Sequence, residues 1–102
     1  MAYEVRVAPA AGRQIRKLGA VAQGAVLEKL EELAEDPRPN GSEKIKGLPR
    51  RYKVYRLAFS CAESWYRVVW QVKDDETLVL VVKLGDRKEV YERMSDLKRL
   101  LL

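Results

Sequence analysis

The sequence has no histidine and a single cysteine, Cys61, among its 102 residues. Without histidine the chain cannot form an imidazole-based catalytic triad, a paired-histidine nuclease site or a zinc site with histidine ligands. One cysteine cannot form an intramolecular disulfide or a thiolate cluster, and it has no histidine partner for thiol catalysis. We therefore expect no metal or other cofactor, and a protein of the reducing cytoplasm.

Long apolar runs are also missing. No segment approaches the ~20 apolar residues that span a bilayer, and the N-terminus lacks the apolar core of a signal peptide. We therefore expect no membrane association. The chain has 102 residues, 47% of them hydrophobic, which suffices for one core, so we expect a single domain over 1–102.

Positive charge is concentrated in one short segment. The net charge is +5, from 20 basic and 15 acidic residues. Between 44 and 56 there is no acidic residue, and the basic residues there are Lys44, Lys46, Arg50, Arg51, Lys53 and Arg56. A charge run by itself is usually a solvated surface. This one continues into a predicted strand, which favours an anion-binding face.

Hydrophobic periodicity predicts the order β-α-α-β-β-β-α, an α+β fold with a small, mostly antiparallel sheet. The predicted elements are strand 3–8, helices 9–19 and 21–35, strands 51–59, 65–73 and 77–84, and a helix from 89. Proline and glycine predict a loop over 36–49. We expect the two N-terminal helices to form a hairpin on one sheet face and the first strand to join the sheet at an edge. The other face should stay partly open.

Alternation along the strands suggests what this open face carries. Lys53 and Tyr55 share one face of strand 51–59, and Arg67 lies on the less apolar face of strand 65–73. In the simplest register, Arg67 then faces the same side as Lys53 and Tyr55. Arginine binds phosphate through a bidentate fork, lysine binds it as a point charge, and a tyrosine ring stacks on an exposed base. This face is therefore predicted to bind a polyphosphate chain.

A series of short motifs runs in a characteristic order through nearly the whole chain. They are Met-Ala-Tyr at 1–3, Arg-Lys-Leu-Gly at 16–19, Asp-Pro-Arg at 36–38, Lys-Gly-Leu-Pro at 46–49, Tyr-Lys-Val at 52–54, Tyr-Arg-Val-Val-Trp-Gln-Val at 66–72, Gly-Asp-Arg at 85–87 and Glu-Val-Tyr at 89–91. Together they resemble the RelE branch of the RelE/ParE toxin superfamily. The resemblance implies a microbial-RNase-like sheet with helices packed on it.

The same resemblance implies a function. Members of this branch are mRNA interferases, toxins that cut messenger RNA, typically in the ribosomal A site, and are held inactive by a cognate antitoxin. The implied partners are an antitoxin protein, mRNA and the ribosome, within a toxin–antitoxin hetero-oligomer.

The resemblance also implies site residues. Family members use Lys, Arg and Tyr for catalysis, and the matching positions are Lys53, Arg67, Arg87 and Tyr91. Tyr55 stands where the best-known members place a second lysine, and it is a further candidate. Asp86 stands where a basic residue is common. The candidate RNA-binding residues are Lys44, Lys46, Arg50, Arg51, Arg56 and Lys88.

The chemistry needs no metal, because the 2′-OH of RNA can attack the adjacent phosphorus in line. The reaction needs a base, cations at the non-bridging oxygens and a proton for the 5′-oxygen. Lys53 and Tyr91 are both candidates for the base; for Lys53, neighbouring cations would have to lower the pKa from ~10.4. Arg67 and Arg87 would hold the phosphate, Tyr91 would stack on or orient a nucleotide base, and Tyr55 would hydrogen-bond the ribose or phosphate. The expected products are a 2′,3′-cyclic phosphate and a 5′-hydroxyl.

Two other functions remain open at this point. One is a ParE-like toxin that inhibits DNA gyrase without catalysis, a branch that shares the fold but generally lacks the catalytic set. The other is a non-catalytic ribosome- or RNA-binding module, which the tyrosine at position 55 keeps in consideration.

Some conspicuous side chains have simpler interpretations. Trp65 and Trp70 are expected to serve core and sheet packing, and Asp74 to form, with its acidic neighbours, a solubilising hairpin tip. The surplus of leucine at 100–102 predicts an exposed apolar patch for a partner.

Overall fold

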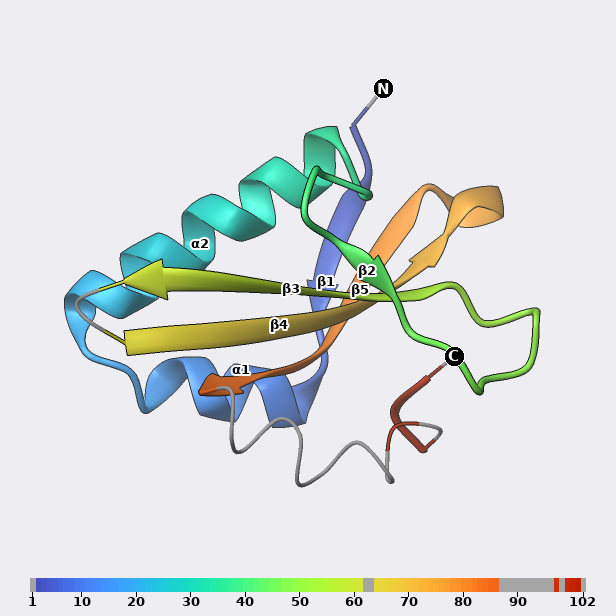
Figure 1. Ribbon diagram of the computed structural model, residues 1–102. Helices are drawn as coiled ribbons and strands as arrows, with labels where there is room; N and C mark the ends of the chain where they lie inside the picture. The colour runs from blue at the N-terminus through green and yellow to red at the C-terminus, as the bar shows by residue number, and fades with distance from the viewer. Residues whose placement is uncertain (1, 62–63, 87–96, 98, 102) are drawn as a thin grey trace.

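The computed structural model describes residues 2–61, 64–86, 97 and 99–101. Its elements, in chain order, are β1 (Glu4–Val7), α1 (Pro9–Arg16), α2 (Ala20–Glu35), β2 (Glu43–Lys44), β3 (Val54–Cys61), β4 (Ser64–Lys73), the 3₁₀ turn η1 (Asp74–Glu76) and β5 (Leu78–Asp86) (Figure 1). The α+β class is confirmed. The two-residue strand β2 was not expected in the loop over 36–49, and the helix predicted from 89 falls largely outside the described residues.

The five strands form one mixed sheet in the order β1-β5-β4-β3-β2. β1 runs parallel to β5, and the other neighbours are antiparallel. The predicted position of the first strand at a sheet edge is confirmed. It cannot form a hairpin with the next strand along the chain because two helices intervene, and a crossover of this length permits parallel pairing. None of the described helices has the length and apolar character that crossing a membrane requires.

The helices α1 and α2 cover one face of the sheet and enclose the main core. Pro9 begins α1, where its missing N–H costs no hydrogen bond. One stripe of α2, comprising Val26, Leu30 and Leu33, is buried against the sheet, as the helical spacing requires. Trp70 is fully buried at the centre of this core. The expected packing of the helical hairpin on one face is therefore confirmed.

The opposite face is more covered than expected. A second core contains Val54, Val69, Leu80 and Val82, and the side chains packed around it are Ala8, Ile45, Leu48, Tyr52, Leu97, Leu100 and Leu101. Residues 78–84 are buried throughout, because β5 presents apolar side chains to both faces. Leu100 and Leu101 thus pack on the sheet, which corrects the expectation that they form an exposed patch; Leu102 lies outside the described residues.

Two features of the strand pairing differ from the simplest pattern. β3 and β4 pair as far as Cys61 and Ser64, so β3 begins and ends later than the predicted strand 51–59, and β4 begins one residue before the predicted strand 65–73. Between β4 and β5 the pairing shifts by one residue, since Val69 faces Lys83 but Trp70 faces Val81. This β-bulge puts two consecutive residues of β5 on one face.

Candidate functional site

The pairing of β3 with β4 decides which predicted site residues can meet. Ala58 lies opposite Arg67, and Tyr55 lies opposite Trp70. Residues directly opposite one another share a sheet face, so Arg67 lies on the face of Arg56 and Ala58, away from Tyr55. The prediction that Arg67 shares a face with Lys53 and Tyr55 was wrong. A one-residue difference in register reverses the face of every side chain, and strand alternation alone does not set that register.

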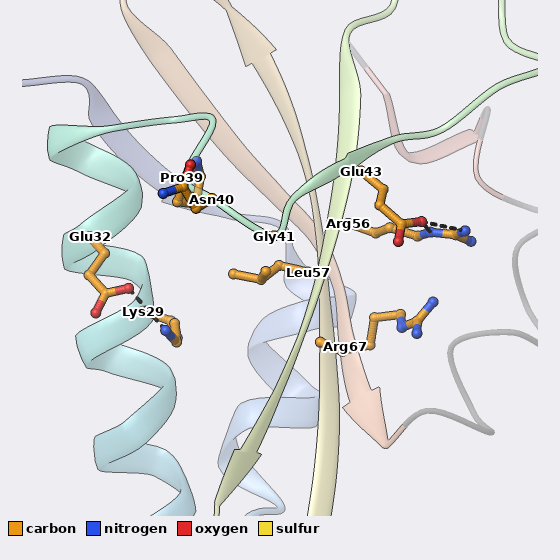
Figure 2. Close-up of a pocket in the computed structure, with 10 residues that line it drawn as sticks. Lys29, Glu32, Pro39, Asn40, Gly41, Glu43, Arg56, Leu57 and Arg67 are labelled. Atoms are coloured by element: carbon orange, nitrogen blue, oxygen red, sulfur yellow. Dashed lines mark hydrogen bonds and ion pairs between the residues drawn. The ribbon is translucent and has the colours of Figure 1, made fainter.

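Arg56 and Arg67 come together on the face that α1 and α2 do not cover. Arg56 lies opposite Val69, two residues from Arg67 along β4, so the two arginines are diagonal neighbours. Both also line a cavity of about 350 Å³ at the edge of β3, whose opposite wall includes Lys29 and Glu32 of α2. Figure 2 shows both guanidinium groups pointing away from α2. Two adjacent guanidinium forks form a site suited to a phosphate group.

A carboxylate already contacts one of these arginines. Glu43 of β2 lies opposite Arg56, and its Oε2 accepts hydrogen bonds from Arg56 Nη2 at 2.9 Å and Nε at 3.2 Å (Figure 2). The Glu43 side chain is 67% exposed and that of Arg56 is 33% exposed. The ion pair is therefore at the rim of the cavity, where a phosphate oxygen could take the place of the carboxylate.

Lys83 adds a third cation to this face. It lies opposite Val69, which lies opposite Arg56, so the three residues form one row across β3, β4 and β5. Lys83 is only 6% exposed. The sequence prediction missed it, although a single cation within the apolar run 78–84 is a signal of a special environment. We call the surface formed by Arg56, Arg67 and Lys83 the arginine face.

Lys53 lies elsewhere, in a cluster centred on Asp74. The two oxygens of Asp74 accept hydrogen bonds from Lys53 Nζ at 3.1 Å, from Arg38 Nη2 at 2.8 Å and Nη1 at 3.3 Å, and from the Tyr3 hydroxyl at 2.8 Å. These residues come from four segments of the chain. Asp74 is thus the shared hydrogen-bond acceptor of these side chains, and the expectation that it serves only in a solubilising hairpin tip was wrong.

Tyr55 belongs to the same cluster. Its hydroxyl accepts a hydrogen bond from Arg38 Nε at 2.8 Å, and the Arg38 guanidinium lies 5.2 Å from its ring centroid. The ring stacks on that of Trp70, whose buried Nε1–H donates to the Pro37 carbonyl oxygen at 2.9 Å. Trp70 is therefore a packing residue, as expected. We call Tyr3, Arg38, Lys53, Tyr55 and Asp74 the Asp74 cluster.

The electrostatics of the Asp74 cluster keep Asp74 and Arg38 charged. Hydrogen bonds from Arg38, then Tyr3 and Lys53, hold the pKa of Asp74 far below its usual range, although partial desolvation opposes them. Hydrogen bonds with Asp74 and then Tyr55 raise the pKa of the Arg38 guanidinium, and the bond to Asp74 raises the pKa of the Tyr3 hydroxyl.

The other predicted residues are dispersed. Lys44, Lys46, Arg50 and Arg51 are exposed. Arg51 lies over the Tyr52 ring, 4.8 Å from its centroid. The remaining predicted site residues, Arg87, Lys88 and Tyr91, lie outside the described residues. Within 2–61, 64–86, 97 and 99–101, no three His, Cys, Asp or Glu side chains converge as metal ligands would.

Comparisons with known proteins bear on this arrangement. Residues 5–91 match the family model described as the ParE toxin of the type II toxin–antitoxin system parDE. The chain is 35% identical over 103 residues to the mRNA interferase toxin RelE of Escherichia coli K12, covering 99% of this chain and 100% of that protein.

Solved structures give the same result. A mutant of the E. coli toxin RelE in the free state matches with a TM-score of 0.76 and 31% identity, over 99% of this chain and 100% of that one. The toxin in the intact E. coli RelBE toxin–antitoxin complex matches with a TM-score of 0.66 and 30% identity, over 83% of this chain and 96% of that one. The chain therefore belongs to the RelE branch of the RelE/ParE toxin superfamily.

Proposed function

We propose that this chain is the toxin of a type II toxin–antitoxin system and that it acts in the cytoplasm as an endoribonuclease on messenger RNA. Its relative in E. coli is named an mRNA interferase, and that toxin occurs in a complex with an antitoxin. A protein antitoxin is the expected inhibitor of this chain as well, and mRNA on the ribosome is the expected substrate.

The observation that carries the proposal is the placement of Arg56 and Arg67 as diagonal neighbours on the arginine face. Their guanidinium groups supply preorganised charge for the two non-bridging oxygens of a phosphodiester, and that charge is most valuable when the pentavalent transition state forms. Lys83, in the next strand, adds to the positive potential of the same surface.

The assignment of acid and base follows from the separation of the arginine face from the Asp74 cluster. Lys53 is ion-paired to Asp74 in a separate cluster, so we assign it a structural role. We assign the base to Tyr91 and the proton donor for the 5′-oxygen to Arg87, the two candidates that follow β5 in the sequence. The attack by the 2′-OH then forms the 2′,3′-cyclic phosphate and releases the 5′-hydroxyl, with no metal required.

The test is to induce the protein in bacteria and to map the new 5′ ends of messenger RNA on translating ribosomes. Wild type should produce new ends that carry a 5′-hydroxyl, and Arg67→Ala should abolish them. Arg13→Ala is the matched control, because Arg13 is an exposed arginine of α1 in the helical layer. New ends that carry a 5′-phosphate would reject the mechanism.

The same experiment addresses the gyrase alternative. Growth arrest with intact transcripts and accumulated DNA breaks would replace the endoribonuclease with a gyrase inhibitor. Growth arrest with neither broken DNA nor new RNA ends would indicate binding without catalysis.

A further inference from the structure

Trp65 is a tryptophan that the fold leaves in solvent. It is 60% exposed, whereas the other tryptophan, Trp70, is fully buried. The expectation that both serve packing therefore fails for Trp65. A tryptophan on a strand that leaves most of its ring in water contributes little to the core, so its position needs another explanation.

The position of Trp65 links it to the arginine face. It precedes Arg67 by two residues in β4, so the two side chains point to the same side of the sheet, about 7 Å apart along the strand. Arg56 lies further along the same face. On the other side of Trp65, its partner in β3 is Ser60, whose small side chain is itself exposed. An exposed aromatic ring thus stands next to the proposed phosphate site in a polar, cationic setting.

We propose that Trp65 is an RNA-binding residue that stacks on an unpaired base adjacent to the phosphate held by Arg56 and Arg67. Proteins bind single-stranded RNA by combining a cationic groove for the backbone with aromatic rings for the bases. Trp65 and the arginine face supply these two parts on one surface. The inference rests on the proposed function and adds to it a contact with the substrate outside the reacting phosphate.

The surroundings favour RNA over a protein partner. The other exposed large apolar side chains in the described part of the chain are Val21 and Leu27 of α2, in the helical layer, and Val7 of the edge strand β1. Among the residues that the structure describes, Trp65 is thus not part of a continuous apolar patch of the kind that marks protein interfaces. Its neighbour on the same face along β4 is Arg67, which complements a polyanion, and its cross-strand partner is the polar Ser60.

Tryptophan fluorescence tests the inference directly, because Trp65 is the exposed one of two tryptophans. The probe is a short single-stranded oligoribonucleotide with 2′-O-methyl groups throughout, which removes the nucleophile and prevents cleavage. Binding should quench the wild-type emission. The same oligonucleotide paired with its complement should give little quenching, because paired bases are not available for stacking.

Variants then separate stacking from charge. Trp65→Ala should weaken binding about tenfold, whereas Trp65→Phe should keep most of the affinity and lose the quenching. Val21→Ala, which truncates another exposed apolar residue, should bind like wild type. Thermal unfolding of each variant confirms that it is folded.

The outcomes distinguish the inference from the function on which it rests. If Trp65→Ala binds the oligonucleotide as tightly as wild type, or if wild type shows no quenching, the stacking role is wrong. Messenger RNA cleavage in induced cells, lost in Arg67→Ala, would still support the endoribonuclease in that case. If wild type neither binds the oligonucleotide nor cleaves messenger RNA, both proposals fail.

Discussion

Arg67 of β4 lies diagonally across from Arg56 of β3, on the sheet face that the helices leave uncovered. Two guanidinium groups in this relation repel one another unless anions lie between them or beside them. Glu43 supplies one such charge at the rim of the cavity. The site is therefore organised for an anion before any substrate binds.

This relationship predicts an order among three substitutions. Arg67→Ala and Arg56→Ala should each lower the rate of messenger RNA cleavage about 100-fold, because each removes a positive charge that stabilises the transition state. Lys53→Ala should lower it less than tenfold, because Lys53 lies in the Asp74 cluster. Cleavage rates in a purified translation system would measure this. If Lys53→Ala lowered the cleavage rate more than Arg56→Ala, Lys53 would have a catalytic role and the assignment made here would be wrong.

Glu43→Gln should strengthen RNA binding. The substitution removes the carboxylate that competes with phosphate for Arg56 while keeping the size of the side chain. Because exposed ion pairs contribute up to about 1 kcal/mol, affinity should rise about two- to fivefold at low salt, and the gain should shrink as salt increases. Titration of a labelled oligoribonucleotide at two salt concentrations measures both effects. Glu76→Gln, which alters an acidic residue paired with Lys73 in η1, is the matched control and should leave binding unchanged.

Asp74→Asn should destabilise the fold in a pH-dependent way. Replacing the acceptor of Arg38, Lys53 and Tyr3 should cost about 1 kcal/mol at neutral pH, since the cluster is partly exposed. The pKa of Asp74 is lowered in the folded chain, so its contribution is present above the unfolded value of ~3.9 and is lost as pH falls toward the folded value.

Urea unfolding of both proteins at several pH values checks this prediction. The difference in unfolding free energy between wild type and Asp74→Asn should be constant above about pH 5 and should shrink as the pH is lowered toward 2. Asp75→Asn changes an exposed neighbour in the same turn and should show no such trend. A difference that stays constant down to pH 2 would show that Asp74 does not act through its charge.

Gly24→Ala should stabilise the protein. Gly24 lies within α2, and a Cβ atom built there meets no atom within 4 Å. Alanine in an exposed helix interior is favoured over glycine by about 0.5–1 kcal/mol, so the midpoint of urea unfolding should rise. Gly41→Ala is the opposite case. Gly41 has φ of +92°, and its Cβ would lie 3.3 Å from Leu57 Cδ1, so the midpoint should fall.

Much of the fold follows from short-range sequence patterns. The helical spacing of Val26, Leu30 and Leu33 predicted the buried stripe of α2, and Pro9 marked the start of α1. The almost wholly apolar segment 77–84 predicted a strand covered on both faces, and residues 78–84 are buried. These predictions succeed because the spacing of apolar residues along a single helix or strand shows which side of that element is buried. The family motifs, which are also local, were sufficient to identify the RelE branch.

The composition of the site depends on relations that no single segment contains. Alternation along the strand placed Lys53 and Tyr55 on one face and Arg56 on the other. Only the pairing of β3 with β4 decided that Arg67 shares the face of Arg56. The bulge opposite Val69 and Trp70 likewise places Lys83 on the arginine face. The sequence by itself therefore determined the elements, the excess of cations and the family. Tertiary structure decided which cations share a surface, because a one-residue change in register moves a side chain across the sheet.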